Sequence, residues 1–274
     1  MLQDILVHIP VEGPAQPVVD CSISLATLFK ASLTAVAFDY QFSDAAVALD
    51  GSVAAVAVQT RVGLEQADIA LGKVADAVEG AGISCSVRKI ELSGSASETL
   101  ARMSRCHDLT IIRQRDTATP GYDDRLAESV LTHSGRPILL VPHIFKGPFE
   151  LRRVLICWDG GAAASRAVHD AMPFLRAAPS LRIVSLNEKN PTSSEVSSKD
   201  LADHLARHGL TAEVDRFDVN PSRIQTTILS IAADYGADLI VMGGYGHSRT
   251  RELLLGGVTR ETFESLTVPA LMSH

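Results

Sequence analysis

Residues 237–246 decide the fold of this chain and read ADLIVMGGYG. The apolar run at 237–242 is typical of a strand that is buried on both faces, as in a parallel sheet. Glycines directly after such a strand let main-chain N–H groups approach an anion without an intervening Cβ atom. Gly256 and Gly257 follow where a new helix is expected to begin, and its dipole favours phosphate. Two glycine-lined turns after one strand therefore predict a nucleotide phosphate site.

The sequence contains an internal repeat. Residues 5–10 (ILVHIP) align with residues 154–159 (VLICWD), and residues 108–112 (DLTII) align with residues 238–242 (DLIVM). The offset between the copies drops along the chain, so the first copy carries extra residues, around 44–80. Apolar residues at helical spacing predict that a long helix lies in this extra stretch.

Each copy is expected to fold as one α/β domain of ordinary size. The predicted domains are residues 1–146 and 147–274, with a linker at 143–150. Within each half, short apolar strands alternate with helical segments, the signature of βαβ units in a parallel sheet. Residues 214–219, for example, alternate as the third strand of the second half. Such a sheet binds ligands at the carboxyl ends of its strands.

Composition limits the classes of protein to consider. Hydrophobic residues make up 46% and charged residues 21% of the chain, as in globular proteins. The net charge is −7 and neither half is basic, which argues against nucleic acid or an anionic membrane as a partner. The four cysteines show no CxxC pairing, which indicates free thiols in a reducing compartment. With no signal sequence or transmembrane run recognised, a cytoplasmic location is expected.

The glycine spacing resembles that of the ATP-binding class of universal stress proteins. Gly243, Gly246 and Gly256 give the pattern G-x2-G-x9-G, and Val258-Thr259 follow. The opening strand of this half ends in Asp159, which agrees with the family pattern. The resemblance covers the chain as two tandem copies. It implies a five-stranded parallel sheet flanked by helices in each half, of the Rossmann-like, adenine nucleotide alpha hydrolase-like type.

The resemblance also implies contacts to an adenine nucleotide, either ATP or ADP or AMP. Asp159 would face the ribose hydroxyls, and Leu186 would offer its backbone to the adenine edge. Met242 and Gly243 would lie beside the ribose and the first phosphate. The other phosphates would be surrounded by the rest of the motif, namely Gly246, Gly256, Gly257, Val258 and Thr259. Mg²⁺ would be held largely through the phosphates rather than by protein ligands.

One position of the motif departs from the family pattern. Gly257 stands where the family usually has Ser or Thr, so one hydroxyl donor to a phosphate is lost. A hydrogen bond to a charged group contributes about 1.5–3 kcal/mol, so ATP affinity is expected to fall about tenfold or more. A mono- or diphosphate nucleotide would then bind comparably well.

The first half departs from the pattern entirely and is predicted to be degenerate for ATP. Pro10 takes the place of the ribose-facing carboxylate, and Arg113 takes the place of the first motif glycine. We expect Arg113 and Arg115 to form salt bridges with Asp123 or Asp124; binding of another anion is the alternative.

Several features leave alternatives open. Asp159 either caps the following helix or contacts ribose. His204 and His208 have the i, i+4 spacing of metal ligands, but no third ligand is placed by sequence, and a helix end is favoured there. Trp158 is expected in the core or at an interface rather than as a stacking platform.

No catalytic signature of related nucleotide-binding folds is recognised, so at most slow ATP hydrolysis is expected. A ligand-free interaction module with vestigial pockets is the rival interpretation. The resemblance implies that the halves pack like the two subunits of a family dimer. Both a monomer with this internal pseudo-dimer and a homodimer remain open.

Overall fold

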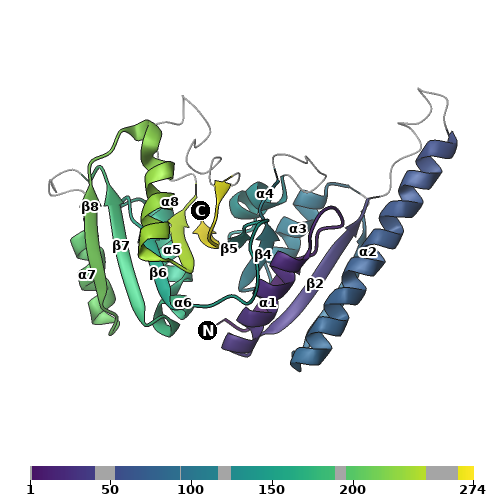
Figure 1. Ribbon diagram of the computed structural model, residues 1–274, viewed down its shortest axis with the longest axis horizontal. Coiled ribbons are helices and arrows are strands. Elements are labelled where there is room, and N and C mark those ends of the chain that lie inside the picture. Colours follow the sequence, from purple (N-terminus) through teal and green to yellow (C-terminus); the bar gives the residue numbers. More distant parts are fainter. Residues whose placement is uncertain (1, 41–52, 93, 117–124, 189–195, 245–264) are drawn as a thin grey trace.

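The computed structural model describes residues 2–40, 53–92, 94–116, 125–188, 196–244 and 265–274, with side chains in the helix that begins at 53 described from residue 67 onward. Its two halves are α/β and lie side by side, with the C-terminal strand at their junction (Figure 1). The strands of the first half are β1 (Asp4–His8), β2 (Ser32–Asp39), β3 (Cys85–Glu91), β4 (Leu109–Arg113) and β5 (Ile138–Val141). Those of the second half are β6 (Arg153–Cys157), β7 (Ser180–Leu186), β8 (Ala212–Phe217), β9 (Leu239–Gly243) and β10 (Ala270–Ser273).

Helices connect the strands in both halves. The first half contains α1 (Gln16–Phe29), α2 (Val53–Ala81), α3 (Ala96–Ser104) and α4 (Leu126–His133). The second half contains α5 (Ala162–Asp170), α6 (Met172–Ala177), α7 (Ser198–Arg207), the 3-10 turn η2 (Pro221–Arg223) and α8 (Ile224–Tyr235). The long helix expected in the first half is α2, which extends well beyond the strands beside it in Figure 1.

Local sequence signals account for where these helices begin and end. Ser197 and Asp200 form a capping box at the start of α7, which satisfies backbone donors of the first turn. Gly236 ends α8 in the left-handed conformation, with φ of 65°. His208 caps the end of α7, as its predicted position at a helix end requires.

The ten strands of the described residues form one sheet in the order β3-β2-β1-β4-β5-β10-β9-β6-β7-β8. Every described pairing within a half is parallel, and β5 and β10 join the halves as an antiparallel pair. The register repeats between the halves, since Ile5 pairs with Leu109 as Val154 pairs with Leu239. The predicted α/β class and the five-stranded parallel sheet of each half are confirmed.

One predicted strand lies two residues too far along the chain. The third strand of the second half was expected at 214–219, but β8 is Ala212–Phe217. The chain leaves the sheet after Phe217, because the N–H of Val219 donates to the side chain of Asn187 at 2.7 Å instead of continuing the ladder.

The core consists of two apolar layers, one on each face of the sheet. Both layers contain buried residues of both halves, so the core continues through the junction. At the junction the ring of Phe29 on α1 packs edge-on against that of Phe174 on α6, with centroids 5.1 Å apart. Arg166 on α5 donates to the backbone oxygen of Gly135, which precedes β5, at 3.0 Å.

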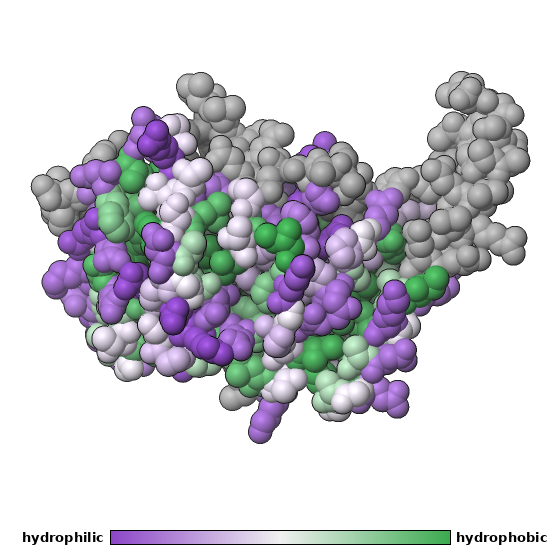
Figure 2. Space-filling model, viewed as in Figure 1, coloured by the Kyte–Doolittle hydropathy of each residue, from purple (hydrophilic) through white to green (hydrophobic). Residues whose placement is uncertain are grey.

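On the face seen in Figure 2, hydrophilic residues surround small apolar patches. The large hydrophobic side chains that stay exposed are spread over both halves; they are Leu28, Ile69, Val87, Ile144, Val196 and Phe217. Within the described part of the chain, no helix has both the length and the hydropathy needed to cross a membrane.

Candidate functional site

The structure brings four of the predicted site residues to one edge of the sheet. Asp159 follows β6, Leu186 ends β7, and Met242 and Gly243 end β9. These strands are neighbours, in the order β9-β6-β7. The strand order reverses between β6 and β9, which is the switch point where such sheets bind ligands. The other predicted contacts, Gly246, Gly256, Gly257, Val258 and Thr259, lie outside the described residues.

Asp159 lies exposed in the turn that leads from β6 into α5. Its Oδ1 atom accepts the N–H of Gly161 at 2.8 Å and so closes the turn that precedes the helix, but Asp159 is not the N-cap of α5. Gly161 is the N-cap residue of α5 and offers no side-chain hydrogen bond. The positive end of the α5 dipole therefore opens beside the Asp159 carboxylate at the strand ends.

Gly243 lies directly against the first turn of α5. A Cβ atom at this position would stand 2.5 Å from the backbone nitrogen of Ala164 and 2.7 Å from the backbone carbon of Ala163. Contacts this short with backbone atoms cannot be relieved by moving a side chain, so only glycine fits. The end of β9 and the start of α5 are thus held together, and Asp159 adjoins the same helix start.

Cys157 lies in β6, two residues before Asp159, and its thiol is held in the interior and is unreactive. Burial raises the pKa of Cys157 to about 12, and the charge of Asp159 adds to the effect. A thiol with this pKa is protonated at neutral pH and is a poor nucleophile. Nothing about Cys157 therefore indicates catalysis.

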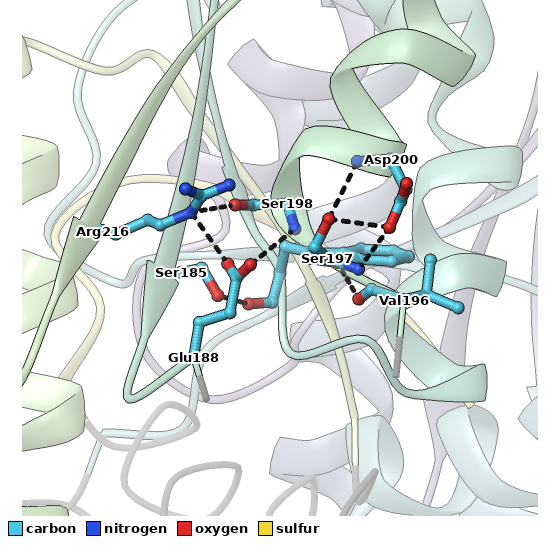
Figure 3. A network of polar contacts seen from close by, with 8 residues as sticks. Ser185, Glu188, Val196, Ser197, Ser198, Asp200 and Arg216 are labelled. Atoms are coloured by element: carbon cyan, nitrogen blue, oxygen red, sulfur yellow. Dashed lines mark hydrogen bonds and ion pairs between the residues drawn. The ribbon is translucent and has the colours of Figure 1, made fainter. Parts of the chain in front are cut away.

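A polar network fixes the segments beside Leu186, and sequence reasoning missed it (Figure 3). The carboxylate of Glu188, just after β7, accepts the N–H of Ser198 at 3.2 Å. Arg216 on β8 lies 3.4 Å from that carboxylate and donates to the hydroxyl of Ser198 at 2.9 Å. These contacts tie the start of α7 to the ends of β7 and β8. The sequence could not predict these contacts from residue spacing, because the partners come from three separate elements.

The charge state of this network follows from its contacts. Burial raises the pKa of Glu188, but hydrogen bonds from Ser198 and Ser185 together with Arg216 outweigh burial and lower it overall. Glu188 is therefore ionised at neutral pH and balanced by a cation. The network is an anchor for α7 rather than a source of catalytic protons.

Trp158 supplies a second anchor for the same region. Its side chain is 6% exposed and belongs to the core, as predicted. Its ring N–H donates to the backbone oxygen of Val196 at 3.1 Å. Gly160 has φ of +73°, and a Cβ atom there would stand 2.8 Å from the same oxygen. The segment that enters α7 is thus packed against the turn that carries Asp159.

The first half has the same strand ends but different side chains on them. The N–H of Ile9 donates to Val36 as that of Trp158 donates to Val184, both at 2.8 Å, so Pro10 occupies the position of Asp159. Pro10 has no carboxylate, so this edge lacks the group predicted to face ribose.

Arg113 ends β4 in the first half as Gly243 ends β9 in the second. Its guanidinium donates to the backbone oxygen of Pro14 at 3.4 Å and covers Gly13, where a Cβ atom would stand 2.5 Å from Nη1. The guanidinium therefore occupies the space beside the turn that follows β1. The predicted salt-bridge partners Asp123 and Asp124 lie outside the described residues.

The predicted histidine pair lies at the end of α7, with His204 in its last turn and His208 as the C-cap residue. The rings of His204 and His208 meet edge to face, with centroids 4.7 Å apart. Over the described ranges, no group of three or more His, Cys, Asp or Glu side chains is arranged to hold a metal ion.

Comparison with known proteins adds an independent finding. Residues 150–274 match the model of the universal stress protein family. A universal stress protein of Synechocystis is 25% identical over 212 residues, which is 76% of this chain and 71% of that protein. This alignment is longer than the stretch 150–274, so it includes part of the first half.

Two solved structures share the fold over both halves. A universal stress protein of Archaeoglobus fulgidus aligns with a TM-score of 0.75 at 18% identity, covering 98% of this chain and 97% of that one. A protein of unknown function from Pseudomonas aeruginosa aligns with a TM-score of 0.63 at 14% identity, covering 99% of this chain and 92% of that one.

Proposed function

Residues 150–274 match the universal stress protein family, and from this match we propose that this part of the chain binds an adenine nucleotide. The observation that carries the proposal is the contact between Gly243 and the start of α5, beside Asp159. A bare backbone, a helix N-terminus and a carboxylate meet there at the switch point of the sheet. Helix N-termini favour phosphate, and a carboxylate accepts hydrogen bonds from ribose hydroxyls.

In this proposal each residue has a defined task. Asp159 accepts from ribose, the backbone of Leu186 reads the adenine edge, and Met242 with Gly243 lines the ribose and the first phosphate. The remaining phosphates would be bound by the rest of the glycine motif, which lies outside the described residues, namely Gly246, Gly256, Gly257, Val258 and Thr259. Mg²⁺ would join through phosphate oxygens.

The bound nucleotide would act through conformation in a stress response rather than through turnover. A ligand works as a switch only when it binds one conformer better than another. The four free cysteines agree with a reducing cytoplasm as the place of action. Because β5 and β10 already pair within the chain, we expect a monomer, and light scattering would reveal a homodimer instead.

Calorimetric titration of the full chain with ATP, ADP and AMP in the presence of Mg²⁺ tests the proposal. We expect binding below millimolar, with ATP no better than about tenfold tighter than ADP, because Gly257 lacks a hydroxyl. The variant Gly257→Ser should raise the affinity for ATP more than that for AMP. If none of the three nucleotides binds below millimolar, the pockets are vestigial and the chain is an interaction module.

A further inference from the structure

Both ends of the glycine motif segment meet the first half of the chain. The residues of the motif after Gly243 fall between Gly244 and Ser265 in the sequence. Gly244 packs on Leu131 of α4, where a Cβ atom would stand 2.5 Å from Cδ2. Ser265 and Leu266, at the other end, meet the side chain of Gln114. The described residues on either side of the predicted phosphate segment therefore contact the half that lacks the motif.

Gln114 makes the stronger of these two contacts. Its side chain is fully buried, with 0% exposed. Oriented to satisfy its neighbours, the amide oxygen accepts the N–H of Leu266 at 2.6 Å and of Ser265 at 2.9 Å, while its nitrogen donates to the oxygen of Leu266 at 3.2 Å. Both acceptor positions of the amide and one donor are thereby used. Without this side chain, the N–H groups of the buried Leu266 and the exposed Ser265 would lose this acceptor, and the loss is costly at the buried residue.

Gln114 occupies the position in the first half that Gly244 occupies in the second. Gln114 follows β4 as Gly244 follows β9, and each donates its N–H to the neighbouring last strand, at Val141 and Ser273 respectively. Where the second half has Gly244, the first half therefore has a side chain that reaches across the junction. The residue that follows β4 in the half without the motif thus contacts Ser265 and Leu266, which follow the predicted phosphate segment of the other half.

We propose that Gln114 is a positioning residue for the nucleotide site of the second half. By fixing Ser265 and Leu266, it holds the downstream end of the motif segment in register with β9 and α5. The first half would then set the nucleotide affinity of the second without contacting the ligand. This inference rests on the proposed nucleotide-binding function.

The positioning role of Gln114 is tested by calorimetry, which measures the affinity of the full chain for ADP in the presence of Mg²⁺. The variant Gln114→Leu is compared with the wild type and with a matched control. The control is Thr110→Val, since Thr110 is buried in β4, which ends just before Gln114, and its hydroxyl has no hydrogen-bond partner among the described residues. We expect Gln114→Leu to bind ADP about tenfold more weakly, the usual size of coupling between linked sites. Thr110→Val should bind as the wild type does. Amide exchange at Ser265 and Leu266 should accelerate in Gln114→Leu while exchange in β1 stays unchanged.

A second variant separates positioning from a merely structural role and serves if Gln114→Leu does not fold. A protonated Glu side chain has an oxygen that can accept and an O–H that can donate in place of the amide groups, and burial raises the pKa of such a group. Gln114→Glu should therefore recover ADP affinity, relative to wild type, at mildly acidic pH and lose it at alkaline pH.

The outcomes are distinct. A wild type that binds no nucleotide overturns the proposed function itself. A wild type that binds, with Gln114→Leu equally tight or Gln114→Glu insensitive to pH, overturns the positioning role alone.

Discussion

The two halves of this molecule have the same strand order and register, but they carry different residues at the carboxyl ends of their strands. In the second half, Asp159 and Gly243 leave an acidic group and a bare backbone beside a helix start. In the first half, Pro10 removes the acid and the Arg113 side chain lies on the turn after β1. Strand pairing depends on buried apolar residues inside the sheet, whereas ligand binding depends on the one or two residues beyond each strand. A repeat can therefore keep its fold while its site is replaced.

The substitution Gly243→Arg would give the second half the edge of the first, and should have the largest effect. The new Cβ atom would collide with the backbone of Ala163 and Ala164. Such overpacking costs about 1–3 kcal/mol of stability. Nucleotide affinity should fall by at least about a hundredfold, since lost contacts to charged phosphate cost about 1.5–3 kcal/mol each. Chemical denaturation and calorimetry on the same preparation measure both effects.

The reverse substitution, Arg113→Gly, is the matched control. It clears the guanidinium from Gly13 but leaves Pro10, so the first half should gain no nucleotide site. Calorimetry should still give one bound nucleotide per chain. A stoichiometry of two would show that the guanidinium alone closes the first half, and that the missing carboxylate is unimportant.

The substitution Asp159→Asn tests the carboxylate with little change to the fold. Asn keeps an oxygen for the N–H of Gly161 in the turn before α5, so stability should change little. Nucleotide affinity should fall about tenfold, the difference between a charged and a neutral hydrogen bond. With 2′,3′-dideoxy-ADP, wild type and variant should bind alike. If the tenfold gap persists with the dideoxy nucleotide, Asp159 does not face ribose.

Much of the fold was predictable, because it rests on short-range patterns. The apolar runs at 108–112 and 238–242 became β4 and β9, and their alignment gave the repeat that the sheet register confirms. The predicted helix cap at Asp159 was wrong, because Gly161 is the N-cap residue of α5 and Asp159 accepts the N–H of that residue in the preceding turn.

The contacts that the sequence did not reveal join residues far apart in the chain. Gln114 reaches Ser265 and Leu266 across the junction, and nothing in its neighbourhood marks it as more than a residue that replaced a glycine. Glu188 and Arg216 meet because β7 and β8 are adjacent, although ordinary charged residues at strand ends are usually solvated. Such pairs become visible only when register and topology are known.

The smallest effect is expected from Glu188→Gln, which tests how each half ties its third strand to the preceding helix. In the second half, Arg216 on β8 holds Glu188 and the start of α7. In the first half, Lys89 on β3 bonds Asp68 on α2 at 2.8 Å, but Asp68 is 62% exposed, whereas Glu188 is 13% exposed. The Gln side chain keeps the acceptor for Ser198 and loses only the charge, so unfolding should become easier by about 0.5–1 kcal/mol at neutral pH.

The stability contributed by the charge of Glu188 depends on pH in a predictable direction. The folded pKa of Glu188 lies below its usual value of 4.5, so its charge stabilises the fold above that value. This stabilisation is lost as the pH falls through the folded pKa. Denaturation curves of wild type and Glu188→Gln should therefore differ at neutral pH and converge in acid. Asp68→Asn should show a smaller difference at neutral pH, because water screens the exposed pair. An equal difference for the two variants would mean that burial in the Figure 3 network adds nothing to the ion pair.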